Sequence, residues 1–287
     1  MISSLYDLPA PAKLNLFLHV IGRGGDGYHQ LQSVFVMLDL ADVIHLSLRT
    51  DGLITREDLA TGNAPSPLPA EDLTVRAAKL LQAHAQVTEG VQIGLLKRTP
   101  AEAGLGGGSS DAATTLIGLN RLWKTGLTRA ELAKLGRQLG ADVPFFIHGT
   151  PAWVEGTGER ITRLPVPVQR YGVVKPPVGL STAAVFNHPQ LNRSTPTVTQ
   201  EWAVNHLALE PLCGHNDLQS VAQLLCPEVD WGLRQLAQHG LQGRMTGSGS
   251  ALFAPLGPGQ TLPPLPNTWF QQECVSLSEH PLFEWSC

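Results

Sequence analysis

Apolar and polar residues alternate along the first hundred positions with the two-residue period of β-strands. Residues 15–21 and 33–38 are rich in apolar side chains, and residues 43–48 and 91–95 alternate. This period places every second side chain on the same face of a sheet. The first hundred residues are therefore predicted to be mainly strands.

Helical spacing of apolar residues appears once within this region and dominates after it. Residues 73–85 have such a pattern, with Asp72 as a suitable N-cap and a loop rich in proline and alanine at residues 60–70 before it. After Gly108 the same spacing predicts helices over residues 111–123, 128–139, 201–212, 217–225 and 228–239.

The helix over residues 128–139 carries signals at both ends. Thr128 and Glu131 have the spacing of a capping box, and Gly140 follows the last apolar position. Asp142 is then expected just beyond this helix. Because Pro144 disfavours a helical conformation at the residue before it, Val143 is expected to be extended.

Strands and helices in separate blocks favour an α+β fold over strict βαβ alternation. Beyond residue 164 prolines interrupt the chain, and short strand-like runs follow at residues 251–254 and 274–277. We place a domain boundary near Thr162, which predicts domains at 1–162 and 163–287. A length of 287 residues fits two packed units that share a cleft.

Composition excludes several classes of protein. Hydrophobic residues make up 43% and charged residues 15%, which excludes a disordered polar chain. The formal net charge of −4 provides no attraction for nucleic acid or for an anionic membrane surface. We therefore expect neither nucleic acid nor a membrane as a partner.

Targeting signals and cysteine spacing suggest the compartment. The first nine residues contain no basic start followed by an apolar stretch, and the longest charge-free segment, 245–272, is broken by glycine and proline. Cys213, Cys226, Cys274 and Cys287 form no CxxC pair. These features predict reduced thiols in the cytoplasm and no membrane span.

The segment from residue 104 to residue 113 contains the most informative motif. Glycines at 104 and 106–108 precede Ser109, Ser110 and a predicted helix, and they follow a predicted strand. Glycines let the backbone approach an anion, and the N-terminus of a helix carries positive partial charge. The loop therefore favours phosphate binding. Walker A and dinucleotide spacings are both absent.

Two alternatives remain open for the glycine-rich segments. The loop at 104–113 could be a strand-to-helix turn in which glycine supplies a positive φ and a serine or aspartate caps the helix. A second loop, residues 246–250, could line the opposite wall of a cleft or be a flexible hairpin turn.

Three segments in order, 11–15, 100–113 and 245–250, resemble the three sequence motifs of the GHMP kinases. Further segments at 12–16, 26–29, 140–144 and 216–218 resemble the branch that phosphorylates a cytidylated methylerythritol in the non-mevalonate isoprenoid pathway. This resemblance implies an N-terminal domain like domain 2 of ribosomal protein S5, a ferredoxin-like C-terminal domain, and ATP and substrate in the cleft between them.

The resemblance also implies roles for particular residues. Lys13 and Asp142 match the catalytic lysine and aspartate that act when the ATP γ-phosphate is transferred to a tertiary hydroxyl. The residues implied at the nucleotide, with Mg²⁺, are Lys97, Pro100, Gly104, Leu105, Gly106, Gly107, Gly108, Ser109 and Ser110. Those implied at the substrate are Asn15, Tyr28, His29, Thr182 and Phe186, with Tyr28 and Phe186 stacking on cytosine and His29 at the base edge.

Each role has a structural alternative. Asp142 could form an Asx turn, Lys13 could face solvent on an edge strand, and Lys97 could be a surface lysine. Tyr28 and Phe186 could be core residues. An inward-facing Lys13 would require an anionic partner, because a buried unpaired ammonium is costly.

The sequence departs from the family pattern at two positions. Asp72 stands where relatives often have asparagine, which puts an adenine contact in doubt, and Glu102 lies near the presumed polyphosphate. Two rival functions remain open. They are a GHMP kinase for another alcohol, such as mevalonate or homoserine, and a catalytically silent nucleotide sensor.

We expect the protein to be a monomer or a weak homodimer.

Overall fold

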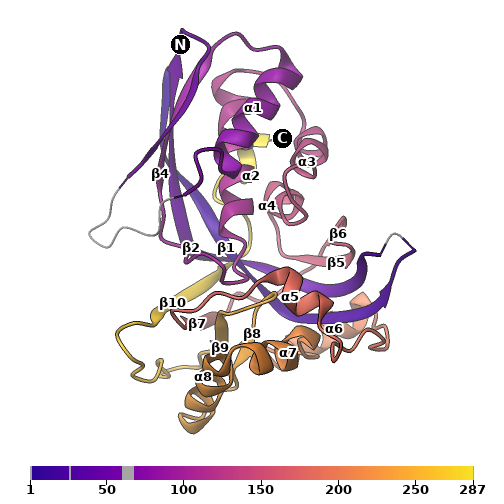
Figure 1. Cartoon of the computed structure of the whole chain (residues 1–287). Coiled ribbons are helices and arrows are strands. Elements are labelled where there is room, and N and C mark those ends of the chain that lie inside the picture. Colours follow the sequence, from indigo (N-terminus) through magenta and orange to yellow (C-terminus); the bar gives the residue numbers. More distant parts are fainter. Residues whose placement is uncertain (1, 26, 60–67, 287) are drawn as a thin grey trace.

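The structure, a computed structural model, describes residues 2–25, 27–59 and 68–286. Asp26, which belongs to the motif at 26–29, most of the loop at 60–70, and Cys287 lie outside the described residues. The elements form one mixed sheet with helices packed against it, which is the predicted α+β class. Figure 1 shows an upper unit that contains α1 to α4 and a lower unit that contains α5 to α8.

Two long antiparallel strands connect these units. β1 (Ser4–Arg23) and β2 (His29–Arg49) pair along nearly their whole length and extend from the upper unit into the lower one (Figure 1). The prediction of separate strands at 33–38 and 43–48 was wrong, because β2 is continuous through Asp42. The carboxylate of Asp42 accepts hydrogen bonds from the backbone NH groups of Arg98 (2.5 Å) and Thr99 (2.7 Å), so it does not interrupt the strand.

The upper unit adds four strands and four helices to these two. β4 pairs with β2 and β3, and β5 pairs with β2 and β6. The added elements are β3 (Ile54–Asp58), α1 (Leu73–Ala85), β4 (Gly90–Leu96), α2 (Gly107–Leu122), α3 (Arg129–Gly136), α4 (Val143–His148), β5 (Ala152–Gly156) and β6 (Arg160–Arg163).

The lower unit joins the same sheet through its last strand. β10 pairs with β2 at Ser276 and Leu277, and the order continues through β7, β9 and β8. The elements of this unit are β7 (Arg170–Lys175), α5 (Thr182–Asn187), α6 (Gln200–Leu209), α7 (Asp217–Leu225), α8 (Pro227–Gln238), β8 (Arg244–Met245), β9 (Leu252–Pro255) and β10 (Phe270–Leu277). The chain then returns to the upper unit, where the 3₁₀ turn Phe283–Ser286 lies against α2 (Figure 1).

The hydrophobic cores cross the proposed boundary near Thr162. Leu18 and Val20 of β1 pack into a core with α7 and α8, while Leu282 near the C-terminus packs into the core of α1 and α2. Each half of the chain therefore supplies apolar side chains to the other, and the division into 1–162 and 163–287 stays a prediction.

Three helix boundaries differ from the predicted ones by three or four residues: the start of α2, the end of α3, and the end of α6, which lies at Leu209 and not at 212. α2 begins at Gly107 and not at 111, because its N-cap is Gly106 in the left-handed conformation (φ 71°). Gly107 and Gly108 are therefore helical despite the low helix propensity of glycine. A Cβ at either position would crowd Thr99 or Leu73, so close packing favours glycine there.

The region around Asp142 also differs from the prediction. The capping box of Thr128 and Glu131 is confirmed, but α3 ends at Gly136, short of the predicted end at 139. Val143 is helical and not extended, because Pro144 occupies the first turn of α4, where a missing NH costs nothing. Asp142 is the N-cap of this short helix.

Candidate active site

A cavity of about 830 Å³ lies where the two units meet, and residues from both line it. Ten of the sixteen residues to which the resemblance assigns roles are part of this lining: Lys13, Asn15, Tyr28, His29, Gly104, Gly106, Ser109, Asp142, Thr182 and Phe186. These residues come from β1, α5, the start of β2 with the residue before it, the start of α2, and the segments that lead into α2 and α4, so tertiary folding brings distant segments to one cavity.

The glycine-rich loop lines the cavity through Gly104 and Gly106. The N-cap of α2 is Gly106, which has no side chain to bond the first NH groups of this helix, so they can bind a ligand. A Cβ at Gly104 would come within 2.2 Å of the carbonyl oxygen of Thr246, and one at Gly106 within 3.0 Å of Lys13 Cγ. Glycine is therefore needed at both positions for close packing as well as for conformation.

Lys13 points inward and is 3% exposed. Its Nζ lies 3.8 Å from Oδ2 of Asp142 and donates a hydrogen bond of 2.5 Å to Oδ1 of Asn15. Burial lowers the pKa of Lys13, and the carboxylate of Asp142 opposes that shift. The anionic partner that an inward-facing lysine requires is therefore present, and the edge-strand alternative does not apply.

The second glycine loop, residues 246–250, connects β8 and β9 and also lines the cavity. Asn15 N donates to Oγ1 of Thr246 (3.0 Å), and Nδ2 of Asn216 donates to the carbonyl oxygens of Met245 (2.8 Å) and Gly247 (2.9 Å). The hydroxyl groups of Thr182 and Ser248 are 2.7 Å apart. The loop is a hairpin turn that lines the cavity, but it packs directly against the first glycine-rich loop and does not lie on an opposite wall, because Ser250 N donates to the carbonyl oxygen of Glu102 (3.3 Å).

Aromatic residues from the start of β2 and from α5 also line the cavity. The rings of His29 and Phe186 are 5.0 Å apart between centroids, and Tyr28 is 66% exposed. Neither Tyr28 nor Phe186 is a fully buried core residue. Sequence analysis missed Arg193, whose Nε donates to Nε2 of His29 (3.0 Å), because no periodicity or motif marks it.

Six predicted residues do not line this cavity: Lys97, Pro100, Leu105, Gly107, Gly108 and Ser110. Leu105 is a core residue at 1% exposure, and Ser110 is completely buried. Leu105 nevertheless ties the loop to the site, because its carbonyl oxygen accepts from the backbone NH of Lys13 (2.9 Å).

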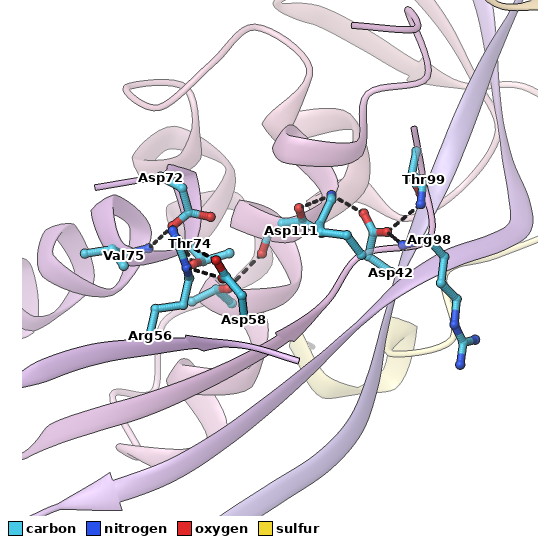
Figure 2. Close-up of polar contacts among 11 residues, drawn as sticks. Asp42, Arg56, Asp58, Asp72, Thr74, Val75, Arg98, Thr99 and Asp111 are labelled. Atoms are coloured by element: carbon cyan, nitrogen blue, oxygen red, sulfur yellow. Dashed lines mark hydrogen bonds and ion pairs between the residues drawn. The ribbon is translucent and has the colours of Figure 1, made fainter. Parts of the chain in front are cut away.

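Lys97 lies in a buried ion-pair network beneath the loop. Its Nζ bonds to Oδ2 of Asp42 and to Oδ2 of Asp111 (2.6 Å). Figure 2 shows these two carboxylates, Asp111 from α2 and Asp42 from β2. Burial acts to lower the pKa of Lys97, but the two carboxylates raise it overall. Burial also raises the pKa of Asp111. The network joins the turn after β4 to the first turns of α2.

We predict that Lys97→Met destabilises the fold, because it leaves two buried carboxylates without a cation. Breaking a buried pair in this way costs about 3–5 kcal/mol, measured by chemical denaturation. The matched control is Lys79→Met, since Lys79 makes an exposed pair with Glu71 and should lose less than about 1 kcal/mol. Equal losses in the two variants would contradict the structural role of Lys97.

The carboxylate of Asp72 has a structural role. Its Oδ1 accepts from the backbone NH of Val75 (3.2 Å), which confirms the predicted N-cap of α1, and lies 2.9 Å from Nη1 of Arg56 (Figure 2). Glu102, the other departure, lines the cavity with its carboxylate against Gly179, where a Cβ would come within 2.0 Å of Oε2.

Comparison with known proteins assigns the chain to a family. The chain is 52% identical over 293 residues to the 4-diphosphocytidyl-2-C-methyl-D-erythritol kinase of Polaromonas sp. strain JS666, with 99% of this chain and 95% of the relative covered. The chain belongs to this branch of the GHMP kinases. The kinase of the same name from Variovorax paradoxus strain S110 is 50% identical, covering 99% of this chain and 100% of that protein.

Family models and solved structures agree with this membership. The models for the GHMP kinases N terminal domain and the GHMP kinases C terminal domain match residues 72–150 and 205–261 of this kinase. A crystal structure of 4-(cytidine 5'-diphospho)-2C-methyl-D-erythritol kinase has a TM-score of 0.75 and 32% identity, with 95% of this chain and 99% of that chain covered.

A more distant structure shows the fold alone. A homoserine kinase from Cytophaga hutchinsonii has a TM-score of 0.68 at 16% identity, covering 98% of this chain and 96% of that one. The predicted GHMP kinase architecture is confirmed.

Three findings concern membrane spans, cysteine thiols and metal ligands. Among the described residues, no helix has the length and apolar character needed to cross a membrane. Cys213, Cys226 and Cys274 are buried free thiols. Within the same residues, no group of three or more His, Cys, Asp and Glu side chains is arranged to hold a metal ion.

Proposed function

We propose that this kinase transfers the γ-phosphate of ATP to the 2-hydroxyl of 4-diphosphocytidyl-2-C-methyl-D-erythritol. The observation that carries the proposal is the pairing of Lys13 and Asp142, 3.8 Å apart, in the cavity that the start of α2 also lines. A cation, a carboxylate and a helix N-terminus together suit phosphoryl transfer, which depends on positioning and charge stabilisation.

Asp142 accepts or orients the proton of the attacking hydroxyl in this proposal. Its side chain makes no capping hydrogen bond to α4, so its carboxylate is not committed to the helix. Lys13 lies beside it and offsets the charge of the transferring phosphoryl group. Phosphate oxygens in the cavity would favour the ammonium form of Lys13 against the effect of burial.

The loop and the helix start would hold the triphosphate through backbone NH groups. A magnesium ion bound with ATP would neutralise phosphate charge. Of the two adjacent serines, Ser109 lines the cavity and Ser110 does not, so the hydroxyl of Ser109 is the better oxygen donor for it. Oxygen donors suit Mg²⁺, which usually keeps several waters and binds few protein groups.

Tyr28, His29 and Phe186 would hold the cytosine, and Asn15 and Thr182 would contact the diphosphate or polyol. Tyr28→Ala and Phe186→Ala should each raise the KM for the cytidylated substrate by about tenfold, because loss of a stacking ring costs on the order of 0.5–1.5 kcal/mol plus lost burial. Steady-state kinetics with each substrate varied should leave the KM for ATP nearly unchanged. Equal effects on both would contradict the cytosine assignment.

A coupled ADP-release assay tests the function directly. Release that requires the cytidylated polyol supports the proposal, whereas release with mevalonate or homoserine favours another GHMP kinase activity. Nucleotide binding without release for any alcohol would support the silent sensor. The presence of both Lys13 and Asp142 in one cavity argues against the sensor.

Three further features of this kinase are proposed with the function. We place it in the cytoplasm, in keeping with its free buried thiols. We also propose that it acts as a monomer or a weak homodimer. Its acidic net charge of −4 supports the proposal that nucleic acid is not a partner.

A further inference from the structure

A single guanidinium group connects two distant parts of the proposed substrate end. Arg193 donates from Nε to Nε2 of His29 (3.0 Å) and from Nη1 to the carbonyl oxygen of Leu191 (3.1 Å). Its Nη2 donates to the carbonyl oxygens of Phe186 (2.9 Å) and His188 (2.9 Å). His29 begins β2, whereas Phe186 and His188 lie at the end of α5.

The chemistry of arginine determines the form of the His29 ring. A guanidinium has five N–H donors and no acceptor, so Nε2 of His29 must present a lone pair to it. A neutral imidazole that accepts at Nε2 carries its proton on Nδ1, and an imidazolium would place two N–H groups against each other. Burial and the charges of Arg193 and Arg23 lower the pKa of His29, which acts in the same direction.

We propose that Arg193 is a positioning residue that holds His29 as the Nδ1–H tautomer, so that the ring presents a hydrogen-bond donor to the base. His29 lines the cavity, and Nδ1 is its remaining ring nitrogen. This inference rests on the proposed function, in which His29 faces the base edge of the cytidylated substrate.

A fixed donor discriminates between pyrimidines. N3 of cytosine is an acceptor, whereas N3 of uracil carries a proton and would meet the Nδ1–H of His29 donor to donor. A histidine free to change tautomer could accommodate either base. Leaving buried polar groups unpaired is an effective basis for rejecting a ligand, so a locked tautomer adds selectivity that stacking alone does not provide.

The same arginine also fixes the stacking surface. By binding the carbonyl oxygens of Phe186 and His188, it holds the end of α5 while the His29 and Phe186 rings lie 5.0 Å apart at an interplanar angle of 36°. Lysine could donate to Nε2 but could not reproduce the planar fork that reaches three carbonyl oxygens. The two functions of Arg193 can therefore be separated by substitution.

The first experiment measures the tautomer in the full-length ¹⁵N-labelled protein by long-range ¹H–¹⁵N correlation at pH 7.5. We expect wild-type His29 to be neutral with its proton on Nδ1, and Arg193→Met to give a mixture of tautomers. The matched control is Arg23→Met, which removes a nearby charge but no bond to the ring, since Arg23 Nε donates to the carbonyl oxygen of Gly27 (2.8 Å). Wild-type His29 protonated on Nε2 would overturn the proposal.

The second experiment compares kcat/KM for the cytidine-linked and uridine-linked polyols. Arg193→Met should lower the cytidine preference at least about tenfold, mainly through KM, with the KM for ATP within about twofold of wild type. Arg193→Lys should keep the Nδ1–H tautomer and most of the preference while raising KM for both polyols, because only the carbonyl clamp is lost.

These outcomes separate the inference from the proposed function. If wild-type protein fails to phosphorylate the cytidylated polyol, the proposed function fails, while the tautomer measurement still tests the effect of Arg193. If both Arg193 variants keep the wild-type tautomer and base preference, Arg193 has only a structural role and the inference fails. Should Arg193→Met not fold, the wild-type spectrum still decides: His29 protonated on Nδ1 supports the proposal, and His29 protonated on Nε2 overturns it.

Discussion

Asp142→Asn should lower kcat by about 10²–10⁴-fold, the range associated with loss of a group that accepts a proton in the transition state. Asparagine keeps the size of the side chain but cannot accept the proton of the attacking hydroxyl. The KM for ATP should change little, because the triphosphate is assigned to the loop and the start of α2. Steady-state ADP release with both substrates varied measures each effect.

The structure predicts a folded variant with a modest loss of stability. The Asp142 side chain is 31% exposed and gives α4 no capping hydrogen bond, so the helix should survive the change. Buried Lys13 loses its anionic partner, however, so the melting temperature should fall below that of wild type. A kcat within threefold of wild type in a folded Asp142→Asn protein would remove Asp142 from the proposed mechanism.

Lys13→Met should lower kcat by about 10³-fold, because the cation that offsets charge on the transferring phosphoryl group is lost. Nucleotide binding should survive in large part and can be measured by calorimetry with a non-hydrolysable ATP analogue. Near-normal turnover would instead show that Lys13 serves only the packing of β1 against Gly106.

The same variant should be at least as stable as wild type in the absence of ligand. The folded protein lowers the pKa of Lys13, chiefly through burial, so the unfolded chain binds more protons between that lowered pKa and the usual 10.5. Wild-type stability therefore rises with pH through that window, and Lys13→Met should lack this rise. A marked loss of stability in Lys13→Met at neutral pH would contradict this reading of the burial cost.

Comparison of the two lysines shows how much a buried charge depends on its partners. Lys97 is bonded to Asp42 and Asp111, and its pKa is raised, whereas Lys13 has one carboxylate at 3.8 Å and its pKa is lowered. We therefore expect opposite effects on stability from the two Lys→Met changes. Measuring both in one buffer separates the structural lysine from the one assigned to chemistry.

Local sequence signals predicted the local structure well. The capping residues Asp72 and Thr128 lie where helices α1 and α3 begin, and the helix over 217–225 has the predicted bounds. Each of these signals involves residues within one turn of one another. Where the local rule met a stronger constraint, as at the glycines of α2 and at Pro144, the boundary moved.

The sequence by itself determined the kinds of group that the site would contain: a lysine in an apolar strand, a glycine-rich loop before a helix, and an aspartate near Gly140. Tertiary structure alone decided which of them share a cavity, that Lys97 pairs with two carboxylates, and that Arg193 reaches His29 across 164 positions. The physical reason is that propensity, capping and hydrophobic period act between near neighbours in the chain. Burial, charge pairing and ring orientation depend on contacts that exist only after distant segments pack together.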